Sequence, residues 1–287
     1  GFPSAWAKND TEYLSLSEAL IQEYEGDPFV HTTIAPHAPY TVNDAALKRC
    51  AEISDKYGVP IHMHVNETAV EVSDSLRDHH ERPIDRLERL GLLNERLIAV
   101  HSVHASDKDI TKMAAAHASV CHCPCSNLKL ASGFAPIAKF LKAGINLGIG
   151  TDGAASNDKL DMLGETRLAA MLAKAVAQDP TAAPVFAMLE AATLGGARAL
   201  RWDADIGSLE IGKAADLFAI DLGTPESLPV ADPAAQILYS AGRECITHTW
   251  VDGRLIMEKH ARAAYPQTDA LAAAALCAQK WQSRLKN

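Results

Sequence analysis

Five short apolar runs alternate with five helical segments over residues 30–177, and this alternation is the feature that most constrains the fold. Short apolar runs bounded by turn residues are typical of buried strands, and the segments between them have helical spacing. Strands and helices that alternate in this way form a parallel sheet covered by helices. The predicted strands are residues 30–35, 59–64, 97–101, 118–122 and 145–151, and the predicted helices are residues 43–56, 83–90, 106–116, 134–143 and 161–177.

A histidine or an aspartate stands at or just after the end of each predicted strand. A single histidine on an apolar strand is usually a packed core residue, but five polar ends in equivalent positions favour a common site. Imidazole and carboxylate together suit zinc or ferrous iron that activates water. Barrel enzymes hold their catalytic groups at this end of the strands, so the pattern favours a barrel, with an open doubly wound sheet as the alternative. The five residues are His37, His64, His101, His122 and Asp152.

The character of the chain changes after residue 200. Short apolar runs punctuated by glycine predict strands at residues 206–211, 215–221, 246–251 and 254–256, followed by an alanine-rich helix over residues 269–286. We therefore expect a barrel portion over residues 1–200 and a small β-sandwich portion with a C-terminal helix over residues 201–287.

Composition excludes several classes of function. The formal net charge is −9, and the basic residues are scattered, which argues against a nucleic-acid partner. No apolar run approaches the roughly 20 residues that span a bilayer, and we expect no membrane partner. The chain has six cysteines among its 287 residues. A chain of this size has a large enough core to fold without a disulfide framework, so we expect a reduced, cytoplasmic protein.

Six segments of the chain resemble the amidohydrolase superfamily, in particular its cytosine-deaminase-like branch, which includes methylthioadenosine/S-adenosylhomocysteine deaminases and triazine hydrolases. Each segment alone is a weak signal, but all six occur in the family's order. They are residues 35–40 (Ala-Pro-His-Ala-Pro-Tyr), 62–68 (His-Met-His-Val-Asn-Glu-Thr), 100–104 (Val-His-Ser-Val-His), 123–127 (Cys-Pro-Cys-Ser-Asn), 150–157 (Gly-Thr-Asp-Gly-Ala-Ala-Ser-Asn) and 207–217 (Gly-Ser-Leu-Glu-Ile-Gly-Lys-Ala-Ala-Asp-Leu).

The resemblance implies a distorted (β/α)₈ barrel, a small β-sandwich and one divalent metal ion, usually zinc, with iron as the alternative. By motif, His64 and Asp152 are metal ligands. The family's other two ligands form a His-x-His pair on the first strand, and no such pair lies upstream of His37. The five predicted strands therefore correspond to strands four to eight, and we expect the chain to fold stably only with the missing N-terminal half of the barrel.

The resemblance also implies roles for four further positions. Glu67 becomes the proton shuttle, His101 hydrogen-bonds the attacking water or the tetrahedral centre, and His37 and Glu67 contact the substrate. Asp152 binds the metal and accepts the proton of the water, and Ser156 contacts the substrate. The structural alternatives are a helix cap for Asp152, a surface glutamate opening a helix for Glu67, a core histidine for His101 and a structural turn around His37.

The expected reaction is hydrolytic deamination of an adenosine-type purine nucleoside, with methylthioadenosine or S-adenosylhomocysteine as the best match. Alternatives are a guanine or 8-oxoguanine deaminase, a triazine chlorohydrolase, or a non-catalytic fragment that lacks the first-strand ligands. Relatives self-associate, so a homo-oligomer is expected.

Cys121, Cys123 and Cys125 are interpreted as packed thiols, because Pro124 disrupts a shared ligand face. His79 and His80 are placed in a polar loop, and His104 in a supporting role.

Overall fold

The computed structural model describes residues 3–225, 227–258, 261–262, 272–273, 275–277 and 279–280. The chain divides into two compact units, Gly1–Gly207 and Ser208–Asn287. The division lies seven residues after the boundary expected from the change in sequence character. Within the described residues, no helix has the length and apolar character needed to cross a bilayer.

The first unit is built on a four-stranded parallel sheet. Its strands are β1 (Ile61–Val65), β2 (Leu97–His101), β3 (Ser119–His122) and β4 (Asn146–Ile149), hydrogen-bonded in chain order. In a doubly wound fold the strand order reverses within the sheet. It does not reverse here, so the arrangement is that of part of a barrel. The predicted α/β class is confirmed.

The predicted strand at residues 30–35 is wrong in extent. Only Ile34 pairs, through an isolated parallel bridge to Ile61. Ile34 N–H donates to Pro60 O (2.9 Å) and His62 N–H donates to Ile34 O (3.0 Å). Among the described residues, the other positions of this segment have no strand partner, so the sequence overestimates the length of the strand.

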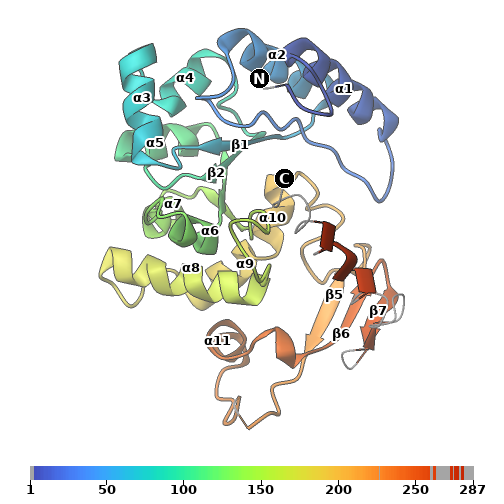
Figure 1. Ribbon diagram of the computed structural model, residues 1–287. Coiled ribbons are helices and arrows are strands. Elements are labelled where there is room, and N and C mark those ends of the chain that lie inside the picture. The colour runs from blue at the N-terminus through green and yellow to red at the C-terminus, as the bar shows by residue number, and fades with distance from the viewer. Residues whose placement is uncertain are drawn as a thin grey trace. The chain divides into compact units, whose positions relative to one another are not determined.

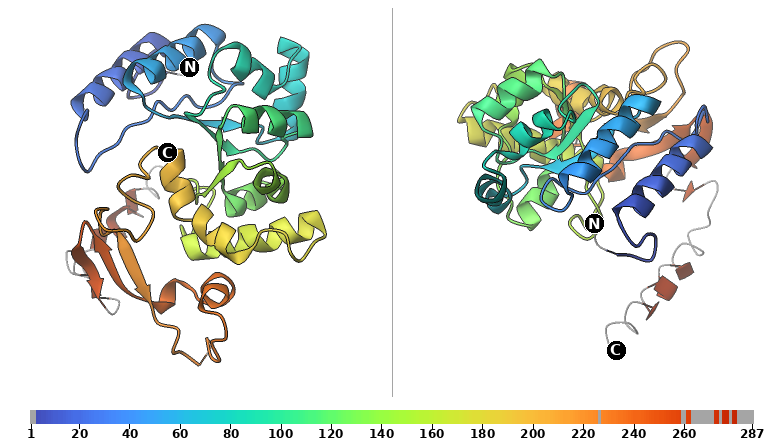
Figure 2. Two further views of the ribbon diagram at one scale, coloured as in Figure 1. Left: turned by 180° about the vertical axis from the view of Figure 1, so that it is seen from behind. Right: turned by 90° about the horizontal axis from the view of Figure 1, so that it is seen from above.

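Among the described residues of the first unit, ten helices accompany these strands, and α2 to α8 form an arc around them (Figures 1 and 2). The predicted helices correspond to α2, α4, α5, α7 and α8, whereas α1, α3, α6, α9 and α10 are not predicted. The ten are α1 (Asp10–Glu23), α2 (Asp44–Tyr57), α3 (Ala69–His79), α4 (Pro83–Arg89), α5 (Asp107–Ala115), α6 (Pro124–Lys129), α7 (Ile137–Lys142), α8 (Met162–Ala177), α9 (Val185–Ala191) and α10 (Leu194–Ala199).

Local sequence explains where several of these helices begin. The Asn43 side chain caps α2 by accepting from Ala46 N–H (2.9 Å), and Ser106 with Asp109 forms a capping box at α5. Pro136 disfavours helical geometry in the residue before it. Helix α7 therefore starts at Ile137, later than predicted. His79, predicted in a loop, is the last residue of α3.

Side chains alternate along β1, and this alternation separates the core from the site. Ile61, Met63 and Val65 are at most 1% exposed, whereas His62 and His64 are partly exposed. The apolar face packs among the helices, and the opposite face carries the histidines. The core of this unit therefore lies between the strands and the helical arc.

The second unit contains an antiparallel sheet in the order β5 (Leu217–Ile220), β6 (Ile246–Val251), β7 (Arg254–Glu258) and β8 (Ala261–Arg262), with α11 (Pro233–Tyr239) and the 3₁₀ helix η1 (Arg243–Cys245). The strand predicted at residues 206–211 is wrong, because Gly207 and Gly212 have φ of 91° and 101° and turn the chain. Most of the helix predicted over residues 269–286 lies outside the described residues; those described within it are helical.

Gly195 in α10 allows a close approach of that helix to β4. A Cβ atom at Gly195 would lie 2.1 Å from Leu147 O, whereas one at Gly196 meets nothing within 4 Å among the described residues. We expect Gly195→Ala to lower the free energy of unfolding by about 1–3 kcal/mol or more, because backbone must move to relieve the clash. Chemical denaturation measures the change.

Gly196→Ala is the matched control. It adds the same methyl group to the same helix without a clash, so stability should stay the same or rise by up to about 1 kcal/mol. Equal losses in both variants would contradict the close packing of α10 on β4.

Candidate active site

The predicted site residues gather at the carboxyl ends of the parallel strands. In the strand register Val65 lies opposite His101, and Cys121 lies opposite Gly148, so the chain segments that follow leave the sheet at one edge. The rings of His37 and His64 have centroids 4.9 Å apart, and those of His64 and His101 are stacked at 5.4 Å. Three histidines from three separate segments thus form a row.

The ring orientation of His64 suits it to bind a metal. Its Nδ1 lies 2.5 Å from His37 O. A carbonyl oxygen only accepts, so Nδ1 carries the proton and the lone pair of Nε2 is free. Metal-binding histidines are usually oriented in this way by a second hydrogen bond.

Asp152 is held as a carboxylate by three donors. Oδ2 accepts from Ser126 Oγ (2.6 Å) and Ser156 Oγ (2.8 Å), and Oδ1 accepts from Gly153 N–H (2.7 Å). Burial by itself raises the pKa of Asp152, but these hydrogen bonds outweigh it and the pKa is lowered. The backbone of Asp152 is left-handed, with φ of 61°, and turns the chain three residues after the end of β4. Asp152 is therefore an ionised oxygen donor.

Ser156, predicted to contact substrate, is buried and donates to Asp152. Ser156 therefore orients the carboxylate of Asp152. Its place as a substrate contact stays a prediction.

Glu67 follows β1 and lies beside His101. Glu67 Oε2 is 4.0 Å from His101 Nε2, and Glu67 Oε1 accepts from Ser132 Oγ (3.2 Å). The backbone N–H groups of Asn66 and Glu67 donate to the buried carboxylate of Glu71 at 2.9 and 2.6 Å. The start of this loop is therefore fixed by hydrogen bonds, and so is the place from which the Glu67 side chain extends.

His101 is 1% exposed, and its Nδ1 lies 2.8 Å from Asn127 Oδ1. The amide oxygen accepts from Nδ1–H, which turns Nε2 toward Glu67. His37 is oriented by Thr41, whose Oγ1 lies 2.9 Å from His37 Nδ1. Partial burial first, and then the neighbouring His64, lowers the pKa of His37, which favours the neutral imidazole.

His122, the fifth polar strand end, does not join this row. It is 2% exposed, and neither ring nitrogen has a hydrogen-bond partner among the described residues. Burial lowers its pKa to about 3, so it is a neutral core histidine. His104 supports Ser132, since its Nε2 lies 2.7 Å from Ser132 O.

Three residues around the site were not singled out by sequence reasoning: Ser126, Asn127 and Ser132. The first two lie in the Cys-Pro-Cys-Ser-Asn segment, where the cysteines draw attention first. The cysteine thiols are free, and Pro124 starts α6. This helix carries Ser126 and Asn127 to Asp152 and His101.

The residues present offer two candidate donors for a metal ion. His64 offers an imidazole Nε2 and Asp152 a carboxylate, the donor types that zinc accepts. Among the described residues, no group of three or more His, Cys, Asp or Glu side chains is close enough to hold a metal ion. The donors fit a metal, but a four-coordinate site needs others beyond these two.

A cavity of about 440 Å³ adjoins the first unit's histidine row, with His37 and Ile34 in its wall. Trp6, Tyr13 and Leu14 contribute aromatic and aliphatic surface to the same cavity. Mixed apolar lining beside a polar group is common in small-molecule sites.

The chain is similar to several known proteins. Residues 2–256 match the amidohydrolase family. The 5-methylthioadenosine/S-adenosylhomocysteine deaminase of Syntrophobacter fumaroxidans is 40% identical over 257 residues, which cover 90% of this chain and 59% of that protein.

Two solved structures are also similar. An adenosine deaminase from Xanthomonas campestris with bound zinc has a TM-score of 0.95 and 47% identity, covering 99% of this chain and 64% of that one. The atrazine chlorohydrolase of Arthrobacter aurescens, complexed with zinc, has a TM-score of 0.88 and 27% identity, covering 96% of this chain and 62% of that one.

The chain spans about three fifths of the length of the curated relatives it matches, 59% in the Syntrophobacter protein. The match nevertheless extends over nearly all of the described residues, through both units. With the family match over residues 2–256, these findings show that the chain belongs to the amidohydrolase family.

Proposed function

We propose that this chain forms part of a metal-dependent aminohydrolase that deaminates an adenosine-type purine, with 5′-methylthioadenosine or S-adenosylhomocysteine as substrate. The observation that carries the proposal is the convergence of His64, Asp152, Glu67 and His101 at one edge of the sheet. The names and identities of the relatives support the substrate class. The products would be the inosine analogue and ammonia.

His64 and Asp152 would hold the metal, zinc by preference and iron as the alternative. The bound cation would supply a water molecule that is acidic enough to attack near neutral pH. The orientation of His64 by His37 O and of Asp152 by Ser126 and Ser156 supports this assignment. The remaining ligands would come from a His-x-His pair of the kind that the family resemblance implies.

The residues of this chain would then manage the protons. Water would add to the amidine carbon of the purine as Asp152 accepts one of its protons and protonated Glu67 gives its own proton to the adjacent ring nitrogen. The proton on Asp152 would then pass, through Glu67, to the amino group, and the C–N bond would break to release ammonia. The hydroxyl proton of the tetrahedral carbon would return to Glu67 as the carbonyl forms. His101 Nε2, on the same side as Glu67, would hydrogen-bond the oxygen that adds to the carbon.

A second candidate function is a triazine or guanine-type hydrolase of the same branch. The similarity to the atrazine chlorohydrolase supports this candidate. Its identity is 27%, however, which is lower than the 47% identity of the adenosine deaminase. A non-catalytic role is the remaining alternative, and it draws on the incomplete ligand set.

Homo-oligomer formation is part of the proposal and is checked by sedimentation.

The substrate class is tested by ammonia release from a panel of purines and triazines. We expect the zinc-loaded protein, with its N-terminal part, to turn over methylthioadenosine and S-adenosylhomocysteine, and to lose activity on chelation and regain it with zinc. Turnover of chlorinated triazines alone would overturn the adenosine assignment. Activity that survives complete metal removal would overturn the metal-dependent mechanism.

The role of Glu67 is tested by Glu67→Gln. The amide keeps the size and the acceptor for Ser132 but cannot carry the proton, so kcat should fall by about 10²–10⁴-fold. Metal content and melting temperature should stay at their wild-type values. Glu52→Gln, at an exposed position of α2, is the control and should have wild-type kcat. A Glu67→Gln variant with wild-type kcat would exclude Glu67 as the proton shuttle.

A further inference from the structure

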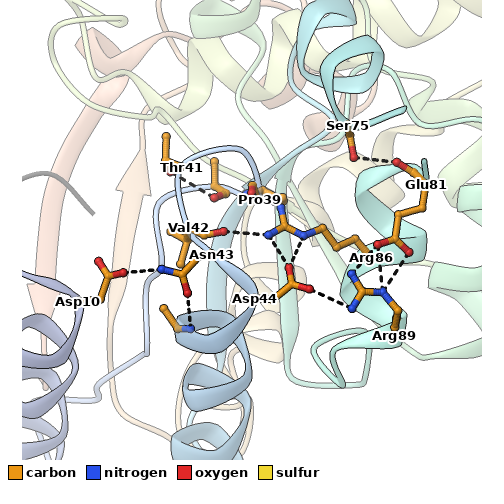
Figure 3. Close-up of polar contacts among 12 residues, drawn as sticks. Asp10, Pro39, Thr41, Val42, Asn43, Asp44, Ser75, Glu81, Arg86 and Arg89 are labelled. Carbon is orange, nitrogen blue, oxygen red and sulfur yellow. Dashed lines mark hydrogen bonds and ion pairs between the residues drawn. The ribbon is translucent and has the colours of Figure 1, made fainter. Parts of the chain in front are cut away.

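His37 lies in a loop, residues 35–43, that has neither helix nor strand to hold it in place. The loop joins the Ile34 bridge to α2 and passes beside α4. Its backbone is instead fixed by side chains that reach it from other elements (Figure 3). A loop that carries a substrate contact needs such support, because small displacements at a reacting centre are costly.

Arg86 of α4 supplies most of that support. Its side chain is 3% exposed, and its guanidinium donates to Pro39 O and to Val42 O, the latter at 3.1 Å. Nε donates to Asp44 Oδ1 at 2.8 Å, so the buried charge is compensated by the first residue of α2. Figure 3 shows the guanidinium placed between the two carbonyl groups and the carboxylate.

Thr41 connects these clamped carbonyls to His37. Thr41 lies between Pro39 and Val42 in the chain, and its N–H and Oγ1 both donate to Ala38 O at 3.2 Å. The same Oγ1 contacts His37 Nδ1. The position of the His37 ring therefore depends on the turn that Arg86 holds.

The loop also reaches the metal ligand. His37 O accepts from His64 N–H at 3.1 Å and from His64 Nδ1. A shift of the loop would move the carbonyl that orients the His64 ring. Arg86 is thus linked to His64 through the backbone turn that contains Thr41 and through His37.

We infer that Arg86 is a positioning residue that holds the loop of residues 35–43, and with it the His37 ring and the His37 carbonyl, in the geometry the site needs. The inference rests on the proposed function, in which His37 contacts substrate and His64 binds the metal. Arg86 touches neither substrate nor metal and acts through the backbone.

The chemistry of arginine suits this task. A guanidinium presents five donors in a rigid plane and can serve two carbonyls and a carboxylate at once. A lysine keeps the charge but has one compact donor group. Arg86→Lys therefore removes the planar clamp without leaving Asp44 opposite a neutral residue.

Arg89, one turn further along α4, provides the matched control. It pairs with Glu81 at 2.6 Å and with the second oxygen of Asp44 at 3.0 Å, and it is 47% exposed. None of its contacts among the described residues reaches the loop carbonyls. Arg89→Gln thus perturbs the same network and leaves the clamp on Pro39 and Val42 intact.

The experiment compares wild type, Arg86→Lys, Thr41→Val and Arg89→Gln in the zinc-loaded protein with its N-terminal part. Steady-state kinetics with methylthioadenosine give kcat and KM, and hydrogen exchange followed by mass spectrometry reports on residues 36–44. We expect Arg86→Lys to lower kcat/KM about ten- to a hundredfold and to speed exchange in this peptide alone. Thr41→Val should lower kcat/KM without lowering the melting temperature, and Arg89→Gln should stay within about twofold of wild type.

Either of two results would overturn the inference. One is an Arg86→Lys variant that melts at a lower temperature and exchanges faster everywhere, but has wild-type kcat/KM below its melting range. The other is wild-type kinetics in Thr41→Val, which carries the test if Arg86→Lys does not fold. If wild type turns over no purine, the proposed function fails, and the exchange of residues 36–44 in Arg86→Lys against Arg89→Gln still decides whether the clamp exists.

Discussion

The parallel register of β1 to β4 is the constraint on which the rest of the first unit depends. Because neighbouring strands run in the same direction and in chain order, each delivers the residues after it to the same edge of the sheet. His64 and His101 lie on β1 and β2, Glu67 lies in the loop after β1, and Asp152 lies in the loop after β4. The imidazole of His64 and the carboxylate of Asp152 are 88 residues apart in the sequence, and the parallel sheet brings them to one site.

Register alone does not orient the side chains, and a layer of neutral donors and acceptors does this instead. His37 O fixes the proton of His64 on Nδ1, Asn127 does the same for His101, and two serines hold Asp152. In both histidines the supporting hydrogen bond engages Nδ1, so Nε2 is on the opposite side of the ring from the supporting partner. Such preorganisation keeps the cost of reorganising the site low when substrate binds.

Much of this arrangement can be read from the sequence, and the remainder has identifiable physical reasons for being missed. His64, His101 and Asp152 directly follow apolar runs, so strand periodicity locates them. Arg86 and Ser132 are not found, because they act on Pro39 and Glu67 across 47 and 65 residues of chain, and no local pattern reports such contacts. Helix α1 is not predicted, because Ile21 is its one buried residue and its sequence carries no wide apolar stripe. The strand at residues 30–35 was overestimated because its composition is that of a strand, although only Ile34 pairs.

The central claim is that one cation is held jointly by His64 and Asp152. An anomalous-scattering map from crystals of the zinc-loaded protein tests it most directly. The account predicts a single zinc peak within about 2.0–2.2 Å of His64 Nε2 and of a carboxylate oxygen of Asp152. A zinc peak bound elsewhere, or one in contact with only one of these two side chains, would contradict it.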